Sequence, residues 1–178
     1  FLKRVDTSGS RLLLLVNDLL DLTKYDQRTM ELDIEQKSLT QLIETAISEL
    51  QSLTEEKHIK VETDYSFMPE VIWCDGARVV QVVVNLLSNA IKFSPEGSKI
   101  GIKTIEGVVT GTDEHCVTLL VRDQGPGIPQ AEVESIFEQF VQSSQTKGGS
   151  GGTGLGLSIC RQIMHAHRGA IYAKNNDE

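Results

Sequence analysis

QVVVNLLSNAIKF, residues 81–93, is the stretch that decides the fold predicted from this sequence. On an α-helix, at about 100° per residue, its polar side chains share one arc of roughly 100° and the rest of the surface is apolar. Solvated helix stripes usually carry Glu, Lys and Arg, whereas Asn and Ser compete with helical hydrogen bonding. This stripe therefore indicates a ligand site, with a buried amphipathic helix as the simpler alternative. Its members are Arg78, Gln81, Asn85, Ser88, Asn89 and Lys92.

Length and composition indicate one globular domain, or one domain with a short appendage. The chain has 178 residues, of which 39% are hydrophobic and 24% charged. The net charge of -8 argues against nucleic acid or an anionic membrane surface as the main partner. Cys74, Cys116 and Cys160 lie far apart and indicate reduced thiols rather than disulfides or a zinc site. The start at Phe1 suggests a piece of a longer protein, whose membrane anchor, if it has one, lies elsewhere.

Residues 1 to about 29 are expected to form one long helix whose apolar positions recur every three or four residues. Such a seam is typical of a helix that packs on partner helices. From Met30 onward, helices alternate with short strands, which predicts one sheet with helices on one face. The expected strands are 31–37, 59–65, 71–74, 99–109, 116–122 and 170–174. The expected helices follow Ser38 or Thr40, follow Asp75, and cover 130–140 and 155–166.

Two glycine-rich stretches follow the predicted helix 81–93. In Asp123-Gln-Gly-Pro-Gly-Ile128 the backbone can approach a flat ligand closely, and Asp123 can accept a hydrogen bond from it. The same residues after a strand are also typical of an ordinary turn. The second stretch, GGSGGTGLGL at 148–157, leads into a helix, and free amides at a helix N-terminus bind phosphate. A flexible linker is the alternative, which the alternation of Leu155 and Leu157 with glycines disfavours.

In this order, the motifs resemble the ATP-binding domain of sensor histidine kinases, a branch of the fold shared with Hsp90, gyrase and MutL-type ATPases. NLLSNAIKF (85–93) is similar to the Asn box of the family, and GGTGLGLSI (151–159) to its second glycine box. The resemblance implies an α+β fold of the Bergerat type, a two-layer α/β sandwich whose mixed, mostly antiparallel sheet carries helices on one face. It also implies that residues 1–30 end the second helix of a dimerisation and phosphoacceptor domain. Residues 31–178 would then be the catalytic domain, without its last strand.

The resemblance implies ATP and Mg²⁺ as ligands. Asn89 would bind Mg²⁺, which prefers oxygen ligands, with Asn85 supporting the metal and phosphate region and Lys92 adding a positive charge. Asp123 would accept a hydrogen bond from the adenine amino group. Phe137, Phe140 and residues 141–152 would form a lid, in which Lys147 approaches the terminal phosphate. The remaining nucleotide-binding residues would be Phe93, Gly125, Gly127, Ile128, Gly152, Thr153, Gly154, Leu155, Gly156 and Leu157.

The residue at position 85, an asparagine, distinguishes ATP hydrolysis from phosphoryl transfer. Hydrolytic relatives carry at this position a Glu that activates water, and an amide cannot act as a general base. The resemblance therefore implies phosphoryl transfer to another nucleophile, such as a histidine imidazole. None of the chain's histidines, His58, His115, His165 and His167, has the flanking sequence of the family's acceptor, and each is expected at the surface or at a helix end. The acceptor is expected upstream of Phe1.

The implied partners are the protein's own dimerisation helices, in a homodimer, and the receiver domain of a response regulator. Neither nucleic acid nor a membrane is an expected contact, and the implied location is cytoplasmic, with an inner-membrane anchor left open for the full-length protein. Two other functions remain open. A serine-phosphorylating, anti-sigma-type kinase is disfavoured by the Leu-rich N-terminal helix. An ATP-sensing module without transfer is disfavoured by Lys92, Asp123 and the glycine boxes.

Overall fold

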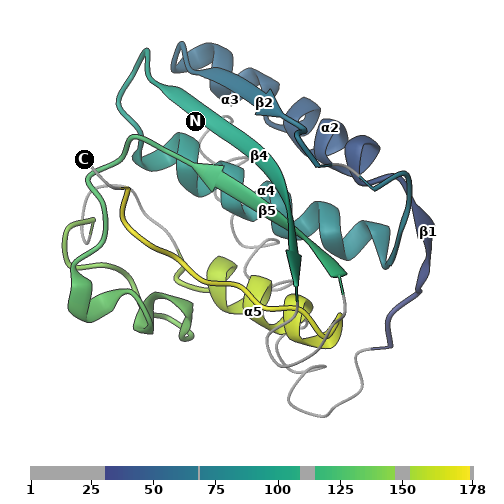
Figure 1. Cartoon of the computed structure of the whole chain (residues 1–178). Helices are drawn as coiled ribbons and strands as arrows, with labels where there is room; N and C mark the ends of the chain where they lie inside the picture. Colours follow the sequence, from purple (N-terminus) through teal and green to yellow (C-terminus); the bar gives the residue numbers. More distant parts are fainter. Residues whose placement is uncertain (1–30, 68, 109–114, 147–152, 177–178) are drawn as a thin grey trace, which may run out of the picture.

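Helix α4 (Gly76–Phe93) lies at the centre of the fold. Strands cover one side of it, and helices α2 (Leu39–Glu49) and α5 (Gly156–Ala166) pack along its flanks (Figure 1). It starts as predicted at the N-cap Asp75, whose Oδ1 accepts a hydrogen bond from the Arg78 amide at 3.1 Å. The computed structural model describes residues 31–67, 69–108, 115–146 and 153–176.

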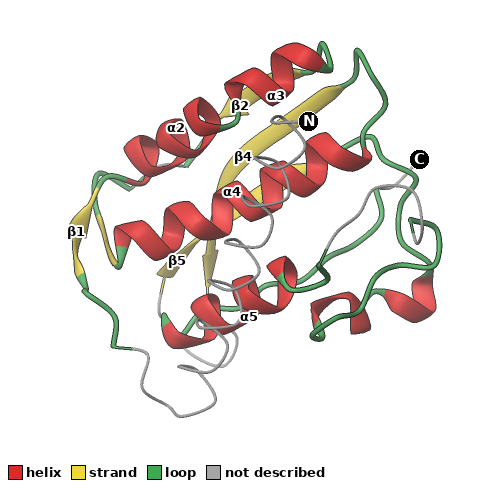
Figure 2. Ribbon diagram, turned by 180° about the vertical axis from the view of Figure 1, so that it is seen from behind, coloured by secondary structure: helices red, strands yellow, loops and turns green. Residues whose placement is uncertain are grey.

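The main sheet has three strands in the order β2-β4-β5, with β2 parallel to β4 and β4 antiparallel to β5. Seen from behind, α2, α3 (Gln51–Glu56) and α4 all lie on one face of it (Figure 2). This confirms the predicted α+β class, with a mixed sheet covered by helices on one face. The strands are β2 (Lys60–Asp64), β4 (Lys99–Val108) and β5 (His115–Arg122).

The prediction of a single sheet is wrong. Strands β1 (Glu35–Lys37) and β3 (Ile72–Cys74) pair antiparallel in a separate two-stranded sheet. The first strand is therefore shorter than the predicted 31–37. Alternating polarity marks a half-buried extended segment, but it does not specify which strand becomes the partner.

The core has two parts, one on each side of α4. On the first, Ile100 and Ile102 of β4 pack with Ile43 of α2 and with Leu87 of α4. On the second, Val82 packs against Leu155, which precedes α5, and against buried side chains of α5: Ile159, Cys160 and Ile163. Burial raises the pKa of the Cys160 thiol to about 12, which keeps it protonated and unreactive in the folded protein.

Two other predicted elements are wrong. Residues 130–140 form two 3₁₀ turns, Gln130–Glu132 and Ser135–Phe137, rather than one helix. Their hydrogen bonds run from Glu132 N to Pro129 O and from Glu138 N to Ser135 O, and the extended conformation of Glu138 ends the second turn.

Residues 170–174 are extended but belong to no strand of the described sheets. Ile171 packs beside α5 while Tyr172 is 67% exposed, so this segment is partly buried without pairing in a described sheet. The predicted helix 1–29 lies outside the described residues. Within them, no helix combines the length and the apolar character that a membrane span needs.

We expect Thr104→Val to raise the free energy of unfolding by about 1 kcal/mol, because a buried hydroxyl without a partner is costly. Thr104 is fully buried on β4, and its Oγ1 has no hydrogen-bond partner among the described residues. Denaturant unfolding measures the change. Thr104→Ser is the control: it keeps the hydroxyl, removes a methyl group and should destabilise. A valine variant less stable than the parent would contradict the prediction.

Candidate functional site

The site is built where the middle of α4 meets the start of α5. Asn85 Nδ2 lies 3.5 Å from the carbonyl oxygen of Gly156, the first residue of α5. A Cβ added at Gly156 would lie 3.5 Å from Asn85 Oδ1, an ordinary van der Waals distance, so the two helices are in contact here. The structure thus brings one residue of the amide stripe next to one residue of the second glycine stretch.

One turn after Asn85, Asn89 lies half-buried on α4. Within the described part of the chain, the structure gives no hydrogen bond to its amide. The last turn of α4 carries Lys92 and Phe93, with the Lys92 ammonium 4.8 Å from the centre of the Phe93 ring. The amide of Asn89, which has no hydrogen bond among the described residues, and the ammonium of Lys92 therefore lie on neighbouring turns of α4.

The loop after β5 closes against this last turn. Asp123 Oδ1 accepts a hydrogen bond from Gly125 N at 2.7 Å, which folds the loop back on itself. A Cβ at Gly125 would lie 2.8 Å from that oxygen and 3.3 Å from the carbonyl oxygen of Phe93. A side chain at this position would displace the Asp123 carboxylate and crowd the Phe93 carbonyl, so glycine suits the close approach of the loop to α4.

The far side of this loop is held by a residue that the sequence analysis missed. Asn175 Oδ1 accepts from Ile128 N, and Asn175 Nδ2 donates to Ile128 O, both at 2.8 Å. Gly127 has φ +77°, and a Cβ there would lie 2.8 Å from Asn175 Oδ1. Asn175 lies 47 residues from Ile128 in sequence, so no local pattern could have indicated this pairing.

The predicted lid begins at an unusual backbone contact. Phe140 has φ +62°, its side chain is 64% exposed, and its amide donates to Gly154 O at 2.9 Å. Gly154 has φ +73° and lies directly against the Phe140 backbone. By contrast, Phe137 is buried in the turn that packs on α5.

The remaining predicted residues differ in their surroundings. Thr153 is exposed and its Oγ1 accepts from Leu155 N at 3.2 Å, while Leu155 is buried and precedes α5. Leu157 is half-buried in the first turn of α5. Lys147 and Gly152 lie outside the described residues. Leu155 therefore serves the core, and its backbone alone can face a ligand.

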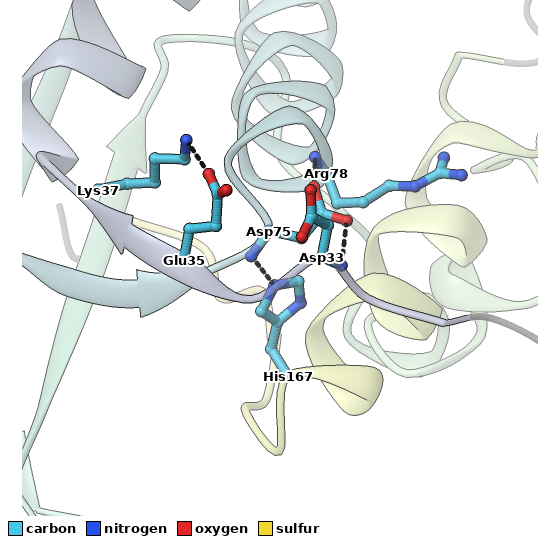
Figure 3. A network of polar contacts seen from close by, with 6 residues as sticks. All are labelled: Asp33, Glu35, Lys37, Asp75, Arg78 and His167. Carbon is cyan, nitrogen blue, oxygen red and sulfur yellow. Dashed lines mark hydrogen bonds and ion pairs between the residues drawn. The ribbon is translucent and has the colours of Figure 1, made fainter.

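A polar junction fixes the opposite end of α4 (Figure 3). His167, which follows α5, accepts a hydrogen bond at Nε2 from the Asp75 amide at 3.0 Å, while its Nδ1 lies 2.9 Å from Ile163 O. Both contacts are satisfied by the neutral tautomer with the proton on Nδ1. Asp75 Oδ2 also accepts from Asp33 N at 3.2 Å. His167 is a helix-end residue, as predicted, and it joins α5 to the start of α4.

A family model described as histidine kinase-, DNA gyrase B-, and HSP90-like ATPase matches residues 74–178. The chain belongs to this family. Sensor histidine kinase WalK of Bacillus subtilis (strain 168) is 30% identical over 174 residues, covering 97% of this chain and 28% of WalK. Adaptive-response sensory kinase SasA of Prochlorococcus marinus (strain MIT 9313) is 38% identical over 128 residues, covering 71% of this chain and 33% of SasA. The chain thus spans about a third or less of these relatives.

Solved structures support the same assignment. Full-length ShkA, in complex with AMPPNP, superposes with a TM-score of 0.79 at 29% identity, covering 96% of this chain and 34% of ShkA. The catalytic domain of the histidine kinase ThkA gives a TM-score of 0.66 at 29% identity, covering 82% of this chain and 90% of that domain. The predicted resemblance to histidine kinase catalytic domains is confirmed.

We expect Gly154→Ala to loosen the junction with Phe140. A Cβ there would lie 2.8 Å from the Phe140 carbonyl carbon, whereas at Gly97, which also has φ +73°, nothing lies within 4 Å. Gly97→Ala is therefore a matched control with the same backbone cost of about 1 kcal/mol and no clash. Hydrogen exchange should show the Phe140 amide opening about tenfold faster in Gly154→Ala alone. Equal exchange rates of the Phe140 amide in the two variants would show that the contact with Gly154 does not need a glycine.

Proposed function

We propose that residues 31–178 are the ATP-binding catalytic domain of a sensor histidine kinase. In this proposal, the domain transfers the γ-phosphate of ATP to a histidine outside this chain, for relay to a response-regulator aspartate. The observation that carries it is the contact between Asn85 and Gly156, which joins the amide stripe to the glycine stretch through an amide side chain at position 85. The nucleotide in the ShkA complex and the names of the relatives support ATP as the ligand.

The loop 123–128 is proposed to bind the adenine. One oxygen of Asp123 is engaged by Gly125 N, so the other can accept from the adenine amino group. Guanine presents an oxygen at that position, which a carboxylate disfavours. Gly127 and Ile128, held from behind by Asn175, would keep the backbone close to the base.

Mg²⁺ is proposed to bind between the triphosphate and Asn89. No cluster of three or more His, Cys, Asp or Glu that could hold a metal occurs among the described residues. A site of one amide oxygen, completed by phosphate oxygens and water, fits the preference of Mg²⁺ for oxygen ligands in the presence of nucleotide. When bound, the ion would neutralise charge on the transferred phosphate. Lys92 would add a second positive charge from the same helix, and the backbone at Gly154 and Gly156 would face the phosphates.

The acceptor is proposed to lie on another segment of the full-length protein. His115 is exposed on β5 with Nδ1 2.8 Å from Glu106, and His58 is exposed near Glu96. His167 uses both ring nitrogens inside the fold. Residues 1–30 would end the second dimerisation helix of a homodimer, and a receiver domain would take the phosphate onward. A cytoplasmic location is part of the same proposal.

We expect Asn89→Ala to remove most of the gain in ATP affinity that Mg²⁺ provides, by about tenfold or more. Isothermal calorimetry with ATP in Mg²⁺ and in EDTA separates the two contributions. Binding in EDTA should be unchanged, which serves as the internal control for folding. Asn89→Asp, which keeps an oxygen ligand, should retain part of the gain. An unchanged Mg²⁺ effect in Asn89→Ala would show that the metal binds elsewhere.

Transfer is tested by incubating the chain with γ-labelled ATP and a fragment of the full-length protein that carries its dimerisation helices. We expect label on that fragment as acid-labile, base-stable phosphate, the behaviour of phosphohistidine. Acid-stable phosphate would instead indicate a serine kinase of the same fold. Binding of ATP without transfer to the fragment would indicate a sensing module.

A further inference from the structure

Lys57, the residue after α3, makes three hydrogen bonds with one ammonium group. Its Nζ donates to the carbonyl oxygens of Ile91 at 2.8 Å, Lys92 at 2.9 Å and Ser94 at 3.0 Å. An ammonium has three N–H donors, so these contacts use all of them. The residue is half-buried, and its donors are aimed at the backbone of α4 instead of at a carboxylate.

The sequence explains why these carbonyls need a donor. The last carbonyls of a helix have no intrahelical partner, and Pro95 cannot supply the N–H that Ile91 O would otherwise receive. A cation at a helix C-terminus also interacts favourably with the helix dipole. The backbone of Lys57 adds a further tie, since its carbonyl accepts from Gly97 N at 2.9 Å. Lys57 therefore holds both the end of α4 and the turn that follows it.

This turn contacts the candidate site directly. Ser94 is 2% exposed, and its Oγ accepts from Gln124 N at 3.4 Å in the loop that follows β5. A Cβ added at Gly125 would lie 3.3 Å from the carbonyl oxygen of Phe93, so the loop packs closely on the last turn of α4. A shift of the last turn of α4 would therefore move Lys92 and press on the loop that carries Asp123.

We propose that Lys57 is a positioning residue of the nucleotide site. Its ammonium fixes the last turn of α4, and through Ser94 and Phe93 it fixes the loop 123–128 against that turn. Because its three donors are all engaged by carbonyls, it acts through the backbone and does not contact the phosphates. This role rests on the proposed binding of ATP at the site, and it assigns to Lys57 a part in nucleotide affinity beyond the stability of the helix end.

The first test removes the ammonium and keeps the fold. Lys57→Met preserves the aliphatic stem but donates no hydrogen bond, and Lys57→Gln is a milder replacement should the methionine variant fail to fold. Lys60→Met is the matched control, because the Lys60 side chain is exposed and its ammonium pairs with Glu62 at 2.9 Å, away from the end of α4. By calorimetry on fully folded protein, we expect ATP to bind about tenfold more weakly to the Lys57 variants and unchanged to Lys60→Met.

The second test asks whether an amine in solution restores binding. Lys57→Ala should lose affinity and regain most of it with n-propylammonium, which replaces the missing carbons and all three donors. Trimethylammonium has the same charge but one donor, and it should not restore binding. A folded Lys57→Met or Lys57→Gln with parental affinity would overturn the inference. So would a loss of affinity that propylammonium leaves unchanged.

A measurement without nucleotide separates this inference from the proposed function. Amide chemical shifts of Gln124 and Gly125 should change in Lys57→Met and return with propylammonium in Lys57→Ala. If the parent chain binds no ATP while these shifts still respond, the proposed function fails and Lys57 is confirmed as the residue that positions the loop. If the parent binds ATP and the shifts do not respond to the loss of Lys57, the inference fails alone.

Discussion

Three sides of helix α4 have different surroundings: the sheet with α2, helix α5, and the candidate ligand site. The rest of the structure depends on how α4 is oriented among them. One face packs on α2 and the sheet through Val83 and Leu87, and another packs on α5 through Val82. The strip between these faces carries Asn85 and Asn89. Since both apolar faces are buried, rotation of the helix would expose core side chains on one side and bury amides on the other, each at a cost of about 1–3 kcal/mol per group. Packing therefore determines where the amides point.

The two ends of α4 are held by groups from distant parts of the chain. At its start, Asp75 is the N-cap and joins His167 and Asp33. At its end, Lys57 occupies the carbonyls that Pro95 leaves without a donor. An 18-residue helix is about 27 Å long, so the contacts of Asp75 at its start and of Lys57 at its end limit its sliding and bending. The amide stripe lies between these two sets of contacts.

Features with a local cause were the ones that the sequence predicted well. The helical periodicity of α4, the cap at Asp75 and the strand expected at 99–109 depend on near neighbours, and the structure confirms them as α4 and β4. The pairing of β1 with β3 and the contact of Asn175 with Ile128 join residues far apart in sequence, for which periodicity carries no information. One missed feature did have a signal. A proline two residues after a helix leaves a carbonyl without its donor, which predicts a donor from elsewhere, although only the fold identifies it as Lys57.

The amide at position 85 has a structural reason as well as a chemical one. Asn85 Nδ2 faces the carbonyl oxygen of Gly156, and an amide can donate a hydrogen bond to that oxygen. A carboxylate there has no proton to donate, so two oxygens would face one another in a half-buried contact between helices. Replacing Asn85 by the water-activating Glu of hydrolytic relatives would thus disturb the contact between α4 and α5. The same amide thus supports the contact of the two helices and, under the proposed function, provides no general base.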